Sequence, residues 1–383
     1  LRRIIYEAFR LYLVIDPTKL GFFRLRLSRN PPLSPSLERG IDNDSVMFHS
    51  AARSIDDFSD GIKAFTGMIT ETIAGNPTVS LIDEPEAFLH PHLAFLLGRE
   101  ISRVTADSQK KLFVSTHSSH FLMGCVQSGV PITIVRLTYR DEVATARTLV
   151  NTDILRLMKN PLLRSTGVLN GLFYECVVVT EADTDRAFYQ EINERLQLEK
   201  PEWSIPNCLF INAQNRQTVP TIVRPLRELG IPAAGIVDID VVKNGGSEWT
   251  TMMEGAFLPA MERDATSLLR TEIKKKFDAS GRDMKRDGGI ALLTGAEREA
   301  VENLFLSLAR YGLFVVPQGE VESWLKALGI PGHGPSWLIG MFERMGEDPT
   351  NDAYIGPGEN DVWYFVHSIK GWFINPARRG IPT

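Results

Sequence analysis

Residues 233–240 read AAGIVDID, an apolar run that ends on two aspartates separated by one residue. A short continuous apolar run of this kind indicates a buried strand of a parallel sheet. Because strand side chains alternate between two faces, we expect Asp238 and Asp240 to lie on the same face. Two carboxylates so placed repel each other unless a cation lies between them. The alternative is a solvated strand end, where aspartates commonly begin a turn.

Strands and helices alternate on both sides of this stretch. The predicted elements are a strand leading into a helix at 175–196, a strand at 207–213, a helix near 221–230, a helical insertion at about 247–310 and a further strand within 313–325. Strand and helix in strict alternation favour a parallel sheet flanked by helices. The sequence therefore predicts an α/β domain over residues 172–383.

The N-terminal part of the chain shows the same alternation. The predicted elements are a helical start at 1–15, a Pro- and Ser-rich connector at 30–45, an amphipathic helix that stops at Gly75, a strand at 78–83, a helix at 91–106, a strand at 111–116 and another strand at 132–138. These elements indicate a first α/β domain over residues 1–160. We expect the two domains to be joined near residues 155–172.

Acidic residues follow the predicted strands of the second domain. Glu181 ends one strand, and Asp185 comes one helical turn later. If this strand neighbours 233–240, Glu181, Asp185, Asp238 and Asp240 converge at one edge of the sheet. Four carboxylates in one place require cations, and oxygen ligands alone favour Mg²⁺ or Mn²⁺.

The first domain carries polar residues at corresponding positions. Asp83 and Glu84 end one apolar strand, and His117 follows the next. Such residues suit a nucleotide-hydrolysing site in which the aspartate orients Mg²⁺ and the glutamate polarises water. Ser59 and Gly61 precede a helix whose N–H groups can face a phosphate. Taken singly, each feature is also explained as a helix cap or a turn.

In this order, the motifs resemble the later half of an ABC-type ATPase head of the SMC and RecF kind. Residues 58–61 match the signature motif, 79–84 Walker B, 85–91 the D-loop region, and His117 the switch histidine. No G-x-x-x-x-G-K-[ST] motif occurs in the sequence, so the phosphate cradle of Walker A is missing. The resemblance and the opening Leu1 lead us to expect a longer natural chain that binds ATP.

The second domain resembles Toprim domains, which occur in primases, topoisomerases and the OLD (overcoming lysogenization defect) family of nucleases. Glu320 and Glu322 resemble the G-[DE]-x-E stretch that serves a second metal ion in OLD nucleases. Ala182 stands where the family commonly has Gly. For the lysine that the family places near the end of Toprim, Lys370 is the candidate. An ABC half followed by Toprim is the OLD arrangement, which the Gabija nuclease subunit shares.

The resemblance implies a metal-dependent DNA endonuclease gated by an ATPase head, in phage defence or DNA repair. Two divalent ions would support phosphodiester hydrolysis, with Glu181 as ligand or general base and a lysine offsetting charge. The implied partners are DNA, a second copy of the chain joined through the heads (a homo-oligomer, at least a dimer) and a second defence-system protein. The alternatives are a topoisomerase or primase-like Toprim enzyme and a non-catalytic scaffold of DNA repair.

Composition narrows the class of protein only slightly. The chain has 383 residues, a formal net charge of −5 and 43% hydrophobic residues, which suits a globular protein of two or three domains. Cys125, Cys176 and Cys208 lie far apart and suggest neither a zinc site nor a disulfide framework, so a cytoplasmic location fits best. No apolar run reaches the length of a membrane span. The basic run at 273–286 suits either the DNA backbone or a solvated helix face.

Overall fold

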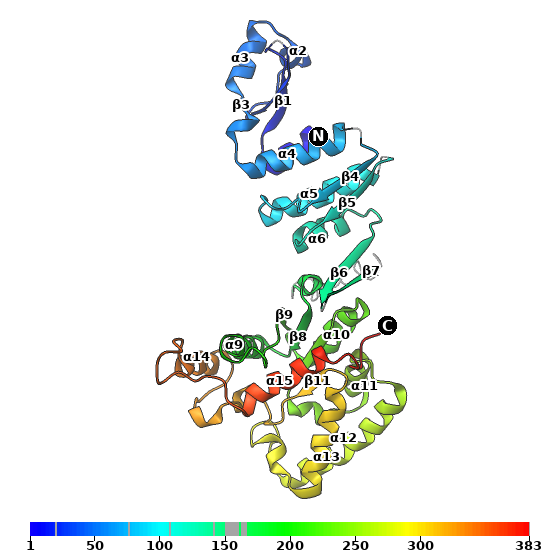
Figure 1. Cartoon of the computed structure of the whole chain (residues 1–383), viewed down its shortest axis with the longest axis vertical. Coiled ribbons are helices and arrows are strands. Elements are labelled where there is room, and N and C mark those ends of the chain that lie inside the picture. The colour runs from blue at the N-terminus through cyan, green and yellow to red at the C-terminus, as the bar shows by residue number, and fades with distance from the viewer. Residues whose placement is uncertain are drawn as a thin grey trace. The chain divides into compact units, whose positions relative to one another are not determined.

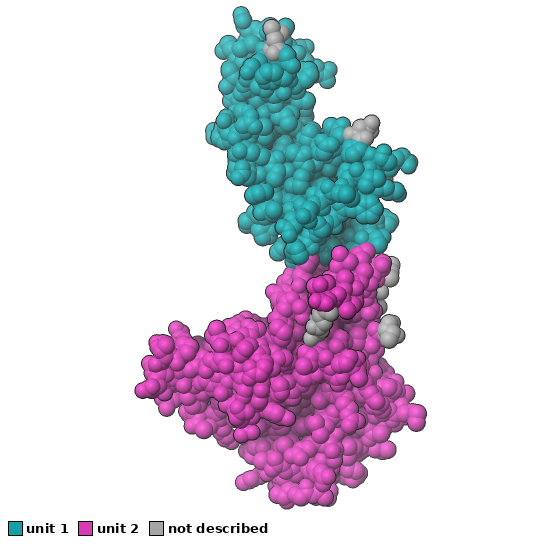
Figure 2. All heavy atoms as spheres, viewed as in Figure 1, with its two compact units in different colours: residues 1–134, 150–155 teal, residues 135–149, 156–383 magenta. Residues whose placement is uncertain are grey.

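The structure is a computed structural model that describes residues 1–19, 21–75, 77–106, 109–140, 142–149, 161 and 167–382. The chain forms two compact units, unit 1 with residues 1–134 and 150–155, and unit 2 with residues 135–149 and 156–383 (Figure 2). Much of the predicted junction at 155–172 lies outside the described residues. Among the described helices, none has both the length and the apolarity needed to cross a bilayer.

Unit 2 is built on a four-stranded sheet in the order β11-β10-β8-β9. All neighbouring strands are parallel. The strands are β8 (Cys176–Thr180), β9 (Cys208–Asn212), β10 (Ala233–Val237) and β11 (Leu313–Val315). Every residue of β8 and β10 is buried, as the apolar run at 233–237 predicts. Because β8 and β10 are neighbours, their carboxyl ends lie side by side.

Helices cover both faces of this sheet, which confirms the predicted α/β class (Figure 1). One face of β8 and β10 packs on α9 (Asp183–Glu199), α14 (Gly334–Met345) and α15 (Asp361–Ile374) in a large apolar core. On the opposite face, α10 (Val219–Glu228) packs against β8 and β10. A Cβ on Gly235 would lie 3.0 Å from Val219 Cγ1 of this helix, so glycine at this position permits close packing of helix and strand.

The predicted helical insertion is present as three helices, of which α12 and α13 pack against each other (Figure 1). They are α11 (Gly246–Gly255), α12 (Ala260–Ser280) and α13 (Gly295–Ala309). Short 3₁₀ helices complete unit 2: η2 (Val168–Phe173), η3 (Arg216–Thr218), η4 (Ile239–Val242), η5 (Gly289–Leu292), η6 (Val321–Ser323) and η7 (Lys326–Leu328). Strands β6 (Ile134–Arg140) and β7 (Val143–Leu149) pair only with each other among the described strands.

Unit 1 contains a parallel pair, β4 (Val79–Asp83) and β5 (Lys111–Ser115), packed on helices. The helices are α1 (Arg2–Phe9), α2 (Pro35–Arg39), α3 (Asn43–Ala51), α4 (Asp60–Ala74), α5 (Pro91–Ala106) and α6 (Ser119–Gln127), with η1 (Ile55–Asp57) as a 3₁₀ turn. The outer face of the pair is open, since Leu81 is 79% and Phe113 62% exposed.

Two predictions for unit 1 are wrong. The helical start ends at Phe9, because the chain then forms β1 (Tyr12–Asp16), which pairs antiparallel with β2 (Arg24–Ser28). Strand β3 (Arg53–Ser54) completes this sheet. The Pro- and Ser-rich connector contains α2 and the start of α3, since Ser34 and Asp42 accept hydrogen bonds as helix N-caps.

Candidate functional site

The ends of β8 and β10 bring Glu181 and Asp238 together. Glu181 directly follows β8, and its Oε1 accepts a hydrogen bond of 2.9 Å from the backbone N–H of Asp238. Asp185 lies in the first turn of α9, where its Oδ2 accepts a hydrogen bond of 3.2 Å from the backbone N–H of Ala182. Ala182 has an extended backbone (φ −131°), which any residue can adopt, so glycine is not needed there.

Asp240 also lies beside Glu181 and Asp238, but not on a continued strand as predicted. β10 ends at Val237, and residues 239–242 form the 3₁₀ helix η4, so the period-two argument does not apply. Even so, Glu181, Asp238 and Asp240 each offer an oxygen within 4.8 Å of the others, close enough to hold one metal ion. The predicted convergence of these three carboxylates is therefore present, but Asp240 reaches it through a 3₁₀ turn and not through strand alternation.

Burial makes this cluster electrostatically costly. Burial, and then the charge of Asp238, raise the pKa of Glu181 to about 8. Burial, and then the same charge, raise the pKa of Asp185 to about 7, with Glu322 adding to the effect. Burial also raises the pKa of Asp238, against the opposing influence of Lys285. Without a cation, the cluster therefore retains protons near neutral pH.

Lys285 is a site residue that the sequence reasoning did not single out. Its Nζ lies 2.7 Å from Asp238 Oδ2 and 3.7 Å from Glu320 Oε2. Burial lowers the pKa of Lys285, but the charge of Asp238 more than offsets this, and the net pKa is raised. The chain can approach here because of Gly319 (φ +123°), where a Cβ would lie 2.0 Å from the carbonyl oxygen of Lys285. In the sequence, Gly319 in the stretch QGEVE (318–322) was the one feature that indicated a close approach of another chain segment.

Lys370, the lysine chosen from the sequence, is not at this site. Its Nζ donates to the carbonyl oxygens of Glu202 and, at 3.5 Å, Pro201, in the turn after α9. α9 begins beside Glu181 and has 17 residues, a length of about 25 Å. Lys370 therefore lies near the opposite edge of the sheet, and the structure does not bring it to the carboxylates as the sequence predicted.

A second group of possible metal ligands forms beside the first. Glu320, Glu322 and His333 each offer an atom within 4.8 Å of the others. Glu320 is the N-cap residue of η6 and Glu322 lies within it, so the two glutamates do not continue the strand, because β11 ends at Val315. Glu320 and Glu322 were predicted as ligands of a second ion, whereas His333 was not singled out. Asp185 belongs to neither group among the described residues, although the charges of Asp238 and Glu322 both act on it.

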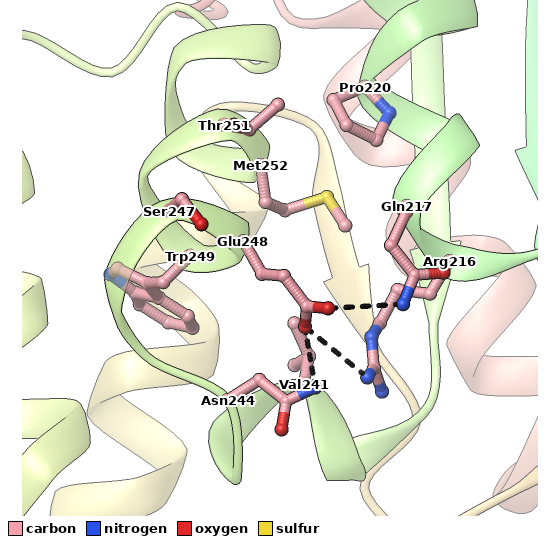
Figure 3. A pocket seen from close by; sticks show the side chains of 10 residues that line it. All are labelled: Arg216, Gln217, Pro220, Val241, Asn244, Ser247, Glu248, Trp249, Thr251 and Met252. Atoms are coloured by element: carbon pink, nitrogen blue, oxygen red, sulfur yellow. Dashed lines mark hydrogen bonds and ion pairs between the residues drawn. The ribbon is translucent and has the colours of Figure 1, made fainter.

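Arg216 links the first group to a neighbouring pocket. Its Nη1 donates to Asp240 Oδ1, and its Nη2 lies 3.9 Å from Glu248 Oε2. Figure 3 shows Glu248 held between Arg216, Gln217 and Asn244 on the wall of a pocket of about 140 Å³. This volume is below the range of about 300–1,000 Å³ that suits a whole small-molecule ligand. Arg216, which lines the pocket and contacts Asp240, places the pocket next to the carboxylate site.

In unit 1, the structure brings Asp83, Glu84 and His117 together at the ends of β4 and β5. Asp83 accepts a hydrogen bond from the hydroxyl of Ser115, and His117 Nε2 lies 3.4 Å from Glu84 Oε1. Glu84 has a left-handed backbone (φ 43°), which is uncommon for a residue with a side chain. Both side chains are open to solvent, His117 by 83% and Glu84 by 52%.

Ser59 and Gly61 lie at the start of α4, away from this trio in sequence but next to the 85–91 segment. A Cβ on Gly61 would lie 2.7 Å from the carbonyl oxygen of Phe88, so only glycine allows this close packing. Ser59 is the N-cap residue of α4, yet its side chain makes no capping hydrogen bond. Its hydroxyl is therefore available to another group.

The basic run at 273–286 divides into two parts. Lys274, Lys275 and Lys276 pair with Asp278, Glu272 and Glu297 respectively, as expected for a solvated helix face. Beyond α12, Arg282 and Arg286 are exposed and flank Lys285 in the loop that reaches the carboxylates.

Two family models match the chain. Residues 23–123 match AAA_21, an AAA domain named with the AbiEii toxin of Type IV TA systems. Residues 172–240 match the overcoming lysogenization defect protein-like Toprim domain. The chain thus carries an ATPase-like domain followed by an OLD-like Toprim domain, the arrangement of an OLD-family ATPase–Toprim fusion, as the sequence motifs indicated. This combination is that of a Toprim enzyme with an ATPase-type domain.

No curated protein matches the chain in sequence. A solved structure described as "Structural biochemistry of ATP-driven dimerization and DNA stimulated activation of SMC ATPases" aligns with 41% of this chain and 88% of its own. The identity is 15% and the TM-score 0.27, a likeness too low to support a conclusion.

Proposed function

We propose that the chain is a divalent-metal-dependent DNA endonuclease whose Toprim domain is regulated by an ABC-type ATPase head. The observation that carries this proposal is the convergence of Glu181, Asp238 and Asp240 beside Glu320 and Glu322. Buried carboxylates in this number are stable in the ionised form only with cations among them. Together they fit a pair of hard divalent ions such as Mg²⁺ or Mn²⁺.

Glu181, Asp238 and Asp240 would hold the first ion, and Glu320 and Glu322 the second. Asp185 lies close enough to both groups that the charges of Asp238 and Glu322 raise its pKa, so its carboxylate would help to balance the charge of both ions. Two ions in such a site supply a nucleophile from water and neutralise charge at a phosphodiester. The alternative role for Glu181 is that of the general base, which would accept the proton from the attacking water.

Basic side chains around the carboxylates would hold the DNA. Lys285 lies between the two groups and now offsets their charge. With cations bound, its ammonium would be free to face the transferred phosphate. Arg282 and Arg286 are exposed on the same loop and would contact neighbouring phosphates.

Unit 1 would control this reaction through ATP and a second copy of the chain. Asp83, Glu84 and His117 have the residue types and proximity of a hydrolytic nucleotide site. Ser59 and Gly61 would serve the site of the partner copy. A role in phage defence or DNA repair, with a second defence protein as partner, is part of the proposal.

The test is cleavage of supercoiled and linear DNA by the full-length protein, with Mg²⁺ or Mn²⁺ and with or without ATP. We expect nicked or linear products that require the metal and disappear in Asp238→Asn. The matched control is Asp183→Asn, because Asp183 is exposed and engaged by Arg186 and Asn212. Relaxed but resealed circles would contradict the proposal and indicate a topoisomerase. Absence of any DNA product with either metal would contradict the endonuclease proposal and leave the primase-like and scaffold interpretations.

A further inference from the structure

His333 is the one nitrogen donor in the two groups of possible metal ligands among the described residues. Its Nδ1 lies 3.8 Å from Glu320 Oε1 and 3.8 Å from Glu322 Oε1. Two ligand atoms about 2.1 Å from a common ion are about 3.8 Å apart when they subtend roughly 130° at it. The ion would therefore fit between these side chains with little movement.

The GIPGHGPS loop is built to present His333 to this place. Gly332 (φ +95°) and Gly334 (φ +61°) flank the histidine in a conformation that other residues rarely adopt. The backbone N–H of Gly334 donates a hydrogen bond of 2.9 Å to Glu322 Oε1. This bond fixes the loop to Glu322. His333 is the N-cap residue of α14, and its ring lies toward the glutamates.

The surroundings of Glu320 are a second, independent observation that favours a cation at this place. The residue is 7% exposed, yet its carboxylate accepts no hydrogen bond from any described residue. Its nearest charged partners are Lys285 Nζ at 3.7 Å and His333 Nδ1 at 3.8 Å. Both distances exceed the range of about 2.7–3.2 Å for a hydrogen bond. A buried carboxylate without a close partner is costly, and a bound cation removes this cost.

We propose that Glu320, Glu322 and His333 form a mixed nitrogen and oxygen site that selects a transition-metal ion such as Mn²⁺ over Mg²⁺. Imidazole is a good ligand for first-row transition ions, whereas Mg²⁺ is bound mainly by oxygen. The first group, with carboxylates alone, lacks this preference. The inference rests on the proposed two-ion site and deepens it by naming the ion that the second position takes.

The experiment uses Mn²⁺ as the probe on the full-length protein, without DNA. Pulsed electron paramagnetic resonance detects ¹⁴N coupled to bound Mn²⁺, and calorimetry measures how many ions bind and how tightly. We expect ¹⁴N modulation in the wild type and its loss in His333→Gln. The same variant should lower the Mn²⁺ affinity of one site by at least about 10-fold, and change the Mg²⁺ affinity by less than about threefold.

The matched control is His117→Gln, because His117 also lies beside a glutamate but in unit 1. Its ¹⁴N modulation should persist. Modulation that survives in His333→Gln, or two bound Mn²⁺ ions without modulation in the wild type, would overturn the assignment. Glu322→Gln should weaken the same site, which guards against loss of signal through misfolding of one variant.

These outcomes separate the inference from the proposed nuclease. If two Mn²⁺ ions bind with His333 coordination but DNA stays intact, the metal assignment stands and the nuclease proposal fails. If DNA is cleaved and the ¹⁴N modulation is absent, the proposed nuclease activity is supported and the assignment of His333 as a metal ligand is wrong. If no Mn²⁺ binds at millimolar concentration, both are wrong.

Discussion

The acidic residues that follow the strands of unit 2 and those of unit 1 differ in their burial and in the cations beside them. In unit 2, Glu181 and Asp238 follow buried strands, and Asp238 is only 8% exposed. Their charges are opposed by Lys285 and Arg216 within the same unit. In unit 1, by contrast, Glu84 is exposed and faces only the exposed His117 in the described structure.

Under the proposed function, this difference leads us to expect that the site in unit 2 can act with the residues present in the chain. Buried carboxylates with cations beside them form a site that needs only metal ions and substrate to be added. The exposed residues on the open β4–β5 sheet present the chemistry of nucleotide hydrolysis without the Walker A cradle. We therefore expect substitutions in unit 2 to abolish the reaction and those in unit 1 to change its control.

The largest effect is expected for Glu181→Gln. The substitution removes one ligand charge from the buried cluster at almost unchanged volume, so the fold should be retained. Cleavage of supercoiled DNA in Mg²⁺ or Mn²⁺ should fall by at least about 10³-fold. Near-normal nicking by this variant, with its metal binding intact, would remove the carboxylate cluster from the reaction.

The second prediction concerns ATP turnover, measured by phosphate release. The 383-residue chain alone should hydrolyse no ATP, because its sequence has no Walker A motif. A longer protein that includes this motif should hydrolyse ATP and lose turnover on Glu84→Gln or His117→Ala. Mn²⁺ binding by unit 2 should be unaffected by Glu84→Gln. ATP hydrolysis by the purified chain alone would contradict the assignment of unit 1.

Lys285 provides the next test of the comparison. Lys285→Ala removes the cation nearest Asp238 and Glu320, so cleavage should fall by about 10²-fold. Lys285→Arg should recover part of the activity, since the positive charge is retained. The control is Lys276→Ala, which breaks an exposed pair with Glu297 and should leave cleavage unchanged. Equal activity in Lys285→Ala and Lys276→Ala would show that Lys285 has no role.

A smaller effect is expected in the stability of the metal-free protein. The pKa of Glu181 is raised by burial to about 8, so in the folded state the group stays protonated while it ionises in the unfolded chain. Its contribution to stability is complete below a pH of about 4.3 and is lost as pH rises toward 8. In EDTA, the free energy of unfolding should therefore fall between pH 5.5 and 8, on the order of a few kcal/mol.

Urea denaturation followed by tryptophan fluorescence measures this effect in unit 2 alone. The six tryptophans all lie in unit 2, at positions Trp203, Trp249, Trp324, Trp337, Trp363 and Trp372. Mn²⁺ should reverse the trend, because the folded protein then needs the ionised carboxylates. Glu181→Gln should reduce the pH dependence in EDTA, and the raised pKa of Asp185 should account for part of what remains. An unchanged slope in this variant would show that another group dominates.

The sequence predicted most of the sheet of unit 2 and most of its carboxylates. Apolar runs that end on acids determine both the buried strands and the side chains at their tips, so Glu181 and Asp238 could be placed together. Lys285 and His333 reach the site from loops, through contacts that have no sequence period. Gly319 and the glycines around His333 are visible in the sequence, but only the tertiary structure shows what approaches them.

Lys370 illustrates the limit of inference from the position of a residue in the chain. A lysine near the C-terminus matched the order of motifs, yet α15 places it beside the turn that follows α9. Helix direction explains the error, because α9 leaves the carboxylate edge of the sheet and ends about 25 Å away. Unit 1 shows the same limit at residues 12–16, where a strand replaces the predicted helix.

The smallest effect is expected for Lys370→Ala. The ammonium donates to two backbone carbonyl oxygens in an exposed turn, and water can replace it as a donor there. We expect the free energy of unfolding to fall by less than about 1 kcal/mol. Cleavage should stay within about twofold of wild type, because the side chain lies near the edge of the sheet opposite the carboxylates. A large loss of cleavage at unchanged stability and metal binding would mean that Lys370 reaches the substrate in another conformation of the protein. The proposed role of Lys285 at the transferred phosphate would then be wrong.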